Sequence, residues 1–110
     1  MPDKIDNPVV KKGLLFHLGR TPGCDKPTER MVYLVADGLI RLHDGEHTHM
    51  VQERPERPLL LLVEINGAAP LAGLISTFAT DAEREDRIAQ VESDGDCYWV
   101  GDLNQTEVVS

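Results

Sequence analysis

The chain has 110 residues, of which 41% are hydrophobic and 27% are charged, and its formal net charge at pH 7 is -8. This length suits one domain with a single core. The acidic balance, with basic residues scattered singly or in pairs, excludes the clustered Lys and Arg that non-specific nucleic-acid binding needs. We therefore expect a single globular domain over residues 1–110, with 1–7 frayed, and no direct contact with nucleic acid.

The first half of the chain predicts strands joined by tight turns. An apolar run at 13–18 predicts a first strand, and the Pro- and Gly-rich segment 19–28 predicts a loop. Two Asp-Gly pairs follow, at 37–38 and 44–45, between short runs of apolar and β-branched residues. An Asp-Gly pair suits a two-residue type I′ hairpin, because both central positions need a positive φ. The sequence therefore predicts a three-stranded antiparallel meander over 31–53.

A helix over 29–42 is the alternative to the first part of this meander. Thr28 suits its N-cap, and several apolar residues after it lie near helical spacing. Gly38 would stand in its middle and would cost about 1 kcal/mol relative to alanine. We favour the strands.

The run Leu59–Ile65 is apolar on both strand faces for most of its length. Such a strand is normally buried on both faces, so we predict that it forms the centre of the sheet. One helix can cover only one face of a sheet. The other face then needs the sheet to curl on itself or a second subunit to dock, and we favour a homodimer.

The C-terminal half predicts one helix between strands. Thr80 and Glu83 form a capping box, and Gly95 is a typical C-terminal stop, so we predict a helix over 81–93. The run 74–79 suits a strand or the start of a helix, and we favour the strand; further strand-like runs follow the helix. The expected fold class is α+β, with a mostly antiparallel sheet of about six short strands and this single helix.

Three of the four histidines fall in the meander, and two of them suggest a metal site. With a two-residue second turn, Leu42 faces His47 and Ile40 faces His49, so the two histidines share one face of the sheet and His43 points to the other. Glu53 continues the face of His47 and His49. Two histidines and a carboxylate are a ligand set for Zn or Fe(II). Surface or half-buried structural histidines are the alternative interpretation.

The string His47-Thr-His49-Met-Val-Gln-Glu53 resembles the H-x-H-x3-E core of the first cupin motif. In that family the two His and the Glu bind a metal inside a small β-barrel. The resemblance covers seven residues, and no histidine follows His49 in this chain. It implies a small cupin-like metalloprotein with His47, His49 and Glu53 as ligands.

The remaining signals concern compartment and contact surface. A disulfide between Cys24 and Cys97 is one possibility, but without a secretory signal we favour two free thiols in the cytoplasm. No apolar run is long enough to span a membrane. Tyr98 and Trp99 are neighbours on one strand, so we expect one to face inward and the other to mark a contact surface.

No residue pattern in the chain assembles a catalytic set. We therefore expect a small non-catalytic binding or interaction module, homodimeric, whose ligand is a protein or a small molecule. The cupin-like metalloprotein is the alternative, with Zn or Fe as its cofactor. A second alternative is an acidic inhibitor that imitates nucleic acid, for which the negative side chains would form one continuous stripe.

Overall fold

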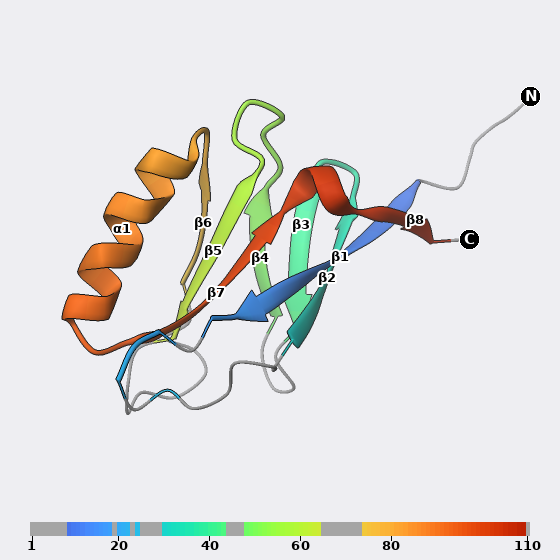
Figure 1. The fold of residues 1–110 in the computed structure, drawn as a ribbon. Helices are drawn as coiled ribbons and strands as arrows, with labels where there is room; N and C mark the ends of the chain where they lie inside the picture. Colours follow the sequence, from blue (N-terminus) through green and yellow to red (C-terminus); the bar gives the residue numbers. More distant parts are fainter. Residues whose placement is uncertain are drawn as a thin grey trace, which may run out of the picture.

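The computed structural model describes residues 9–18, 20–22, 24, 30–43, 48–64 and 74–109. Within these ranges the chain forms an antiparallel sheet and one α-helix, so the expected α+β class is confirmed, with eight strands rather than about six (Figure 1). The elements are β1 Val10–His17, β2 Arg30–Ala36, β3 Leu39–His43, β4 Thr48–Gln52, β5 Leu59–Glu64, β6 Leu74–Phe78, α1 Asp81–Ser93, β7 Cys97–Asp102, the 3-10 helix η2 Leu103–Gln105, and β8 Glu107–Val109.

The strand order is β4-β3-β2-β1-β7-β5-β6, and β8 pairs with the first residues of β1. The long β1 lies in the middle of this order, because it pairs with β2 along one edge and with β8 and then β7 along the other. The prediction that the 59–65 run forms the centre of the sheet is therefore wrong. That run is β5, which lies between β7 and the last strand, β6.

Both faces of β5 are nevertheless buried, as its sequence predicts. Leu60 and Leu62 join a core enclosed by the curled sheet, whereas Leu61 and Val63 pack toward α1. The sheet curls far enough for β4 and β6, its two ends, to contact each other. The second cover for β5 thus comes from the sheet itself, and this strand no longer provides an argument for a homodimer.

The meander over 31–53 is confirmed, with a different register between its second and third strands. Asp37 and Gly38 have φ values of 54° and 77° and join β2 to β3 as a two-residue turn, so the helix over 29–42 is wrong. The second connection is two residues longer than expected, since His43 pairs with Thr48; residues 44–47 lie outside the described part of the chain. This register sets Val51 opposite the buried Ile40, where the expected one would have put a histidine, and burial of apolar surface favours the observed pairing.

Helix α1 coincides with the predicted range 81–93, and both of its ends are capped as expected. The Thr80 side chain accepts a hydrogen bond from the Glu83 amide at 3.2 Å. At the other end Gly95 has a φ of 79°, and the Asp96 amide donates to the Val91 carbonyl at 3.1 Å, which is the Schellman arrangement. No helix in the described ranges is long and apolar enough to cross a membrane.

Candidate docking surface

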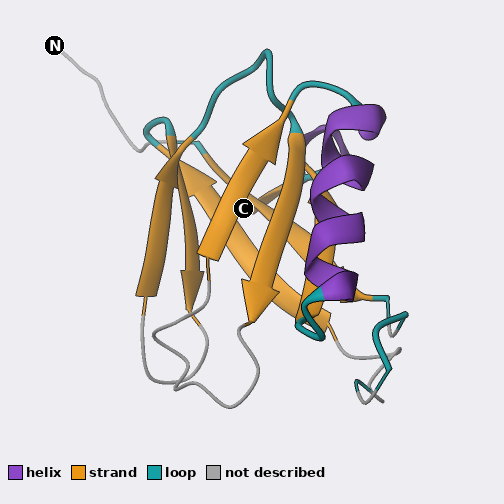
Figure 2. Ribbon diagram, turned by 90° about the vertical axis from the view of Figure 1, so that its left-hand side faces the viewer, coloured by secondary structure: helices purple, strands orange, loops and turns teal. Residues whose placement is uncertain are grey.

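Helix α1 covers only part of the outer side of the sheet, the side that faces away from the enclosed core. It packs on β5, β6 and β7. No helix of the described residues covers the strands of the other half, which we call the bare half (Figure 2). Phe16 of β1 pairs with Val100 of β7, and Val100 packs against the cluster beneath α1. Because directly paired residues point to the same face, the bare half is continuous with the half that α1 covers.

The bare half has the side chains of a buried face. Strands β1 and β2 are apolar on both sides, and their inward residues Leu15, Tyr33 and Val35 are at most 4% exposed. The large apolar residues on their outward side are 37–52% exposed. We use the name outer sheet face for a set of eight of the outward side chains of β1–β4: Lys12, Leu14, Phe16, Arg30, Val32, Leu34, Arg41 and Met50.

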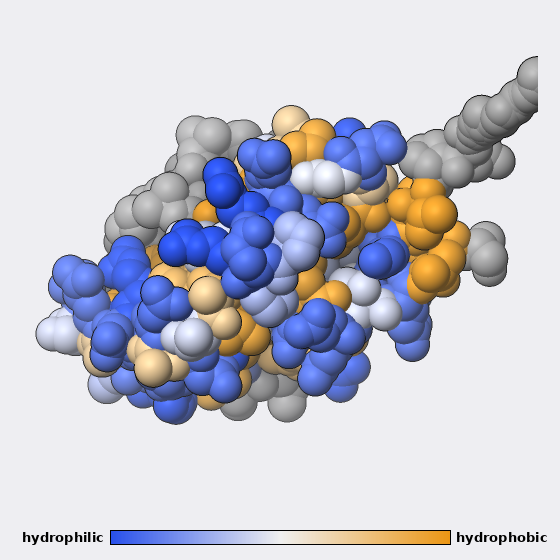
Figure 3. All heavy atoms as spheres, turned by 90° about the horizontal axis from the view of Figure 1, so that it is seen from above, coloured by the Kyte–Doolittle hydropathy of each residue, from blue (hydrophilic) through white to orange (hydrophobic). Residues whose placement is uncertain are grey.

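The apolar members of the outer sheet face are contiguous. Leu14 pairs with Val32, while Leu34 pairs with Arg41, whose partner on the next strand is Met50. The patch extends toward β8, and apolar atoms also gather at the end of the molecule where β1 begins and β8 lies (Figure 3). A contiguous exposed apolar patch, unlike single exposed residues, marks an interaction surface.

The outer sheet face is also hollowed. A depression of about 400 Å³ lies over the junction of β1, β2 and β8. A second of about 210 Å³ adjoins it across Val32 and is lined by side chains from β2, β3 and β4. A third of about 110 Å³ shares Leu34 and Arg41 with the second. The depressions follow one another along β2, so an elongated apolar group can lie across them.

The charged side chains on this face are mostly positive, whereas the chain as a whole is negative. Lys12, Arg30 and Arg41 point outward from neighbouring strands, and Glu107 of β8, which pairs with Lys12, is the one outward carboxylate among the described strand residues there. The chain as a whole has a net charge of -8. The face is therefore both apolar and basic, in contrast to the acidic chain as a whole.

The predicted metal ligands are only partly described. His49 is half-buried and pairs with the inward Leu42, whereas His43 is exposed, so these two histidines point to opposite faces as expected. Glu53 is half-buried just after β4, where its amide donates to the Gly38 carbonyl at 2.8 Å. His47 lies outside the described residues, and the site of His47, His49 and Glu53 stays a prediction.

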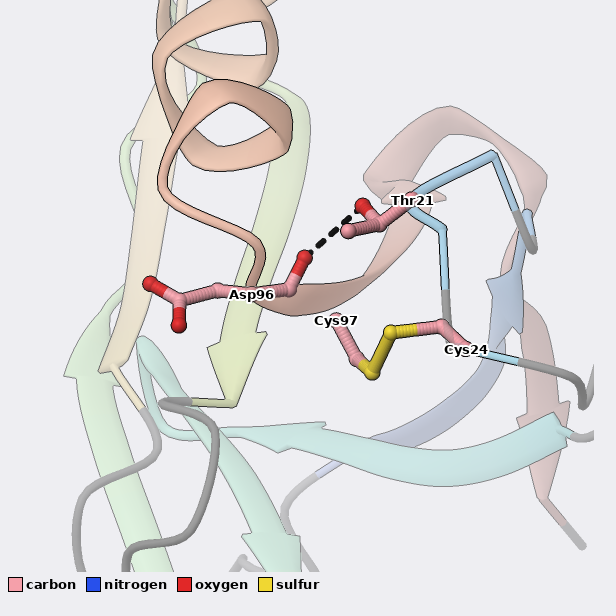
Figure 4. The surroundings of a disulfide bond; sticks show 4 residues. All are labelled: Thr21, Cys24, Asp96 and Cys97. Carbon is pink, nitrogen blue, oxygen red and sulfur yellow. Dashed lines mark hydrogen bonds between the residues drawn. A yellow bond between two sulfur atoms is a disulfide. The ribbon is translucent and has the colours of Figure 1, made fainter.

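A different group of possible ligands comes together at the other end of β1. Cys24 and Cys97 form a disulfide, so the expectation of two free thiols is wrong. Thr21 donates a hydrogen bond to the Asp96 carbonyl at 2.8 Å, which holds the loop after β1 beside the start of β7 (Figure 4). His17 lies next to the two sulfurs. Sequence reasoning left the disulfide open and missed the approach of His17, because a pairing across 73 residues has no local signal.

Tyr98 and Trp99 are both buried, at 1% and 3% exposure, so neither of them marks a contact surface. The expectation failed because β7 is covered on both faces. Trp99 packs in the enclosed core, and Tyr98 packs beneath α1. The Tyr98 hydroxyl donates to Glu92 at 2.6 Å and accepts from Arg20 at 2.7 Å.

The raised pKa values of the two buried tyrosines predict that the protein loses stability at alkaline pH. Burial, together with the hydrogen bond to Glu92, raises the pKa of Tyr98 to about 12, and burial raises the pKa of Tyr33 to about 12. The unfolded value is about 10, so the folded state holds both phenol protons more tightly. The stability that the two protonated tyrosines contribute is therefore fully present below about pH 10, and it is lost as the pH rises toward about 12. Tyrosinate absorbance should appear near pH 12 in the native protein and near pH 10 in denaturant. A tyrosine that ionises near pH 10 while the circular dichroism stays native would contradict this packing.

Comparison of the chain with protein-family models, with curated proteins and with solved structures found no match.

Proposed function

We propose that this chain is a non-catalytic protein-binding module that takes an acidic amphipathic helix of a partner protein across its outer sheet face. The observation that carries the proposal is the two-sided apolar character of β1 and β2, one side of which has no cover in the described part of the chain. Strands of this composition are normally buried on both faces. A partner that covers Leu14, Val32 and Leu34 completes that burial.

The position of helix α1 supports the proposal that the partner segment is a helix, because α1 packs on the other half of the same outer side of the sheet. Its Ile88 and Val91 are buried against Leu61 and Val63 of β5. The surface of α1 is rich in carboxylates, with Asp81 and Glu83 in its first turn. The sheet thus already packs one acidic helix through a small apolar stripe, and the outer sheet face offers a second place of the same kind.

Charge supports an acidic partner. Beside α1, Arg20 approaches Glu85 at 3.4 Å and Glu92 at 3.1 Å, which links the helix to the loop after β1. Lys12, Arg30 and Arg41 on the outer sheet face are available to carboxylates on a second helix in a similar way. Exposed ion pairs of this type steer association more than they strengthen it, and salt weakens them.

A homodimer through the outer sheet face is the competing arrangement. Two copies meeting face to face would bring two sets of three cations together, whereas the apolar stripe of α1 is already buried in its own subunit. We therefore place a different protein, and not a second copy, on this face. Sedimentation equilibrium separates the two: a dimer that Arg41→Glu strengthens would favour the second copy and contradict the proposal.

Replacing Val32 and Leu34 by threonine should abolish most of the binding without unfolding the module. The probe is a library of displayed amphipathic helices, selected on the wild-type protein for binding. We expect the selected helices to carry carboxylates beside an apolar stripe, and the double variant to bind them about tenfold or more weakly in fluorescence anisotropy. Threonine keeps a high strand propensity, and both positions are exposed, so the melting temperature should change little.

Val108→Thr is the matched control, because Val108 is an exposed valine that points away from the outer sheet face. It should bind the selected helices like the wild type. Arg41→Glu should weaken them and make their binding less sensitive to salt. Selected helices that are basic, or that bind the Val32→Thr/Leu34→Thr variant as tightly as the wild type, would overturn the proposal.

A further inference from the structure

His17, Cys24 and Cys97 form the one group of three possible metal ligands in the ranges that the structure describes. Their ligand atoms all lie within 4.8 Å of one another. His17 and Cys24 are 2% and 7% exposed, and Cys97 is partly buried against the enclosed core. The group is thus shielded from water, and it joins a histidine to two sulfurs (Figure 4 shows the disulfide).

The histidine is the unexplained member of this group. Its Nδ1 atom is buried and has no hydrogen-bond partner among the described residues, although buried polar groups are nearly always satisfied. The ring contacts Trp99 edge-on, with the ring centroids 4.9 Å apart, which gives it an apolar neighbour but no acceptor. A buried imidazole with an unsatisfied nitrogen beside sulfur atoms is suited to bind a metal.

We propose that reduction of the Cys24–Cys97 disulfide turns this group into a zinc site with two thiolate ligands and one imidazole ligand. A dithiol reductant supplies two electrons and two protons by thiol–disulfide exchange: its own two sulfurs become a disulfide, and Cys24 and Cys97 become thiols. Zn²⁺ then binds both sulfurs and a ring nitrogen of neutral His17, and the two thiol protons pass to solvent. Two sulfurs and one nitrogen leave a fourth position of the tetrahedral ion open to water or to a small ligand.

The three ligands are held in place without the disulfide. His17 pairs with Trp99 in the ladder between β1 and β7, and Cys97 precedes Trp99 by two residues, so it points to the same face. Cys24 is fixed by its own amide, which donates to the Thr21 carbonyl at 3.0 Å, while the Thr21 hydroxyl donates to the carbonyl of Asp96, the residue before β7.

Conversion to a zinc site needs only a small movement. Bonded sulfurs lie about 2 Å apart, and two thiolates on one zinc ion lie roughly 3.8 Å apart. Rotation of the two cysteine side chains provides this separation, so the backbone can keep its fold.

The test measures zinc binding by the reduced and the oxidised protein. The chain is reduced with a dithiol, freed of reductant without oxygen, and titrated with Zn²⁺ against a chromophoric chelator. We expect the reduced chain to bind one zinc ion more than the oxidised chain does. Co²⁺ in place of Zn²⁺ should give thiolate charge-transfer bands and the intense visible bands of a tetrahedral site.

Three variants identify the ligands. His17→Leu and Cys24→Ser should each lower the affinity of the reduced chain for zinc by about tenfold or more. His43→Leu changes an exposed histidine on another strand and should leave the affinity unchanged. Circular dichroism of the oxidised His17→Leu variant verifies its fold, and circular dichroism of the reduced wild type with and without zinc shows whether the metal binds the folded chain.

The proposal is overturned if the reduced wild type binds no stoichiometric zinc, or if His17→Leu binds it as tightly as the wild type. Zinc that binds only an unfolded reduced chain, without return of the native circular dichroism, overturns it as well.

Discussion

Replacing both Cys24 and Cys97 by alanine should lower the free energy of unfolding by about 4 kcal/mol, because the disulfide closes a very long loop. The two cysteines are 73 residues apart, so the crosslink restrains most of the unfolded chain. Domains of this size are stable by only about 5–15 kcal/mol, so the loss is a large part of the total. Urea denaturation followed by circular dichroism gives the difference directly.

Wild-type protein with a reductant and a metal chelator is the matched control for this double variant. It should lose about the same free energy, since both samples lack the crosslink and any bound metal. A loss of less than about 1 kcal/mol in both would show that the crosslink does not restrain the unfolded chain as this account requires.

Leu61→Ala and Leu62→Ala should each destabilise the protein by about 2–5 kcal/mol, although the two side chains point in opposite directions. Leu61 is fully buried beneath α1, in one cluster with Ile88 and Val91 of that helix. Leu62 is buried at 3% exposure in the enclosed core, together with Trp99. Truncating one leucine leaves a cavity beneath α1, and truncating the other leaves a cavity in the enclosed core. The loss of stability should therefore be large in both variants, because the packing of one layer does not fill a cavity in the other.

The two variants should differ in their spectra. Leu62→Ala should shift the emission of Trp99, the only tryptophan, in the native state, whereas Leu61→Ala should leave that emission nearly unchanged. Leu34→Ala is the control, because Leu34 is 41% exposed on the outer sheet face and should cost much less. If one of the two core variants is as stable as the Leu34→Ala protein, the strand is not covered on both sides as described.

The turn and the helix ends that the sequence predicted correctly depend on residues that are close together in the chain. The Asp37-Gly38 turn needs two positive φ values, and the caps of α1 need Thr80 and Gly95; both features are complete within a few neighbouring residues. The second Asp-Gly pair shows the limit of such local rules. The register of β4 was decided by the apolar pairing of Val51 with the buried Ile40, which no turn signal contains.

Long-range pairing accounts for what the sequence could not predict. β1 is central because it pairs with β2, β7 and β8 in turn, and Cys24 reaches Cys97 only through the pairing of β1 with β7. The sequence did contain a sign that the outward side of β1 is apolar. Leu14, Leu15 and Phe16 are consecutive apolar residues, as in β5, and the rule that identified β5 as buried on both faces applies to β1 as well. For β1 that second cover is the proposed partner.

The most direct test of a docking surface on β1–β3 is an NMR titration of the isotope-labelled, oxidised protein with a displayed helix selected on the wild type. The account predicts that the amide shifts cluster on Leu14, Val32, Leu34 and their neighbours, and that the amides of α1 stay unchanged. Shifts that cluster on α1 or on the closure between β4 and β6, with the outer sheet face unchanged, would contradict it.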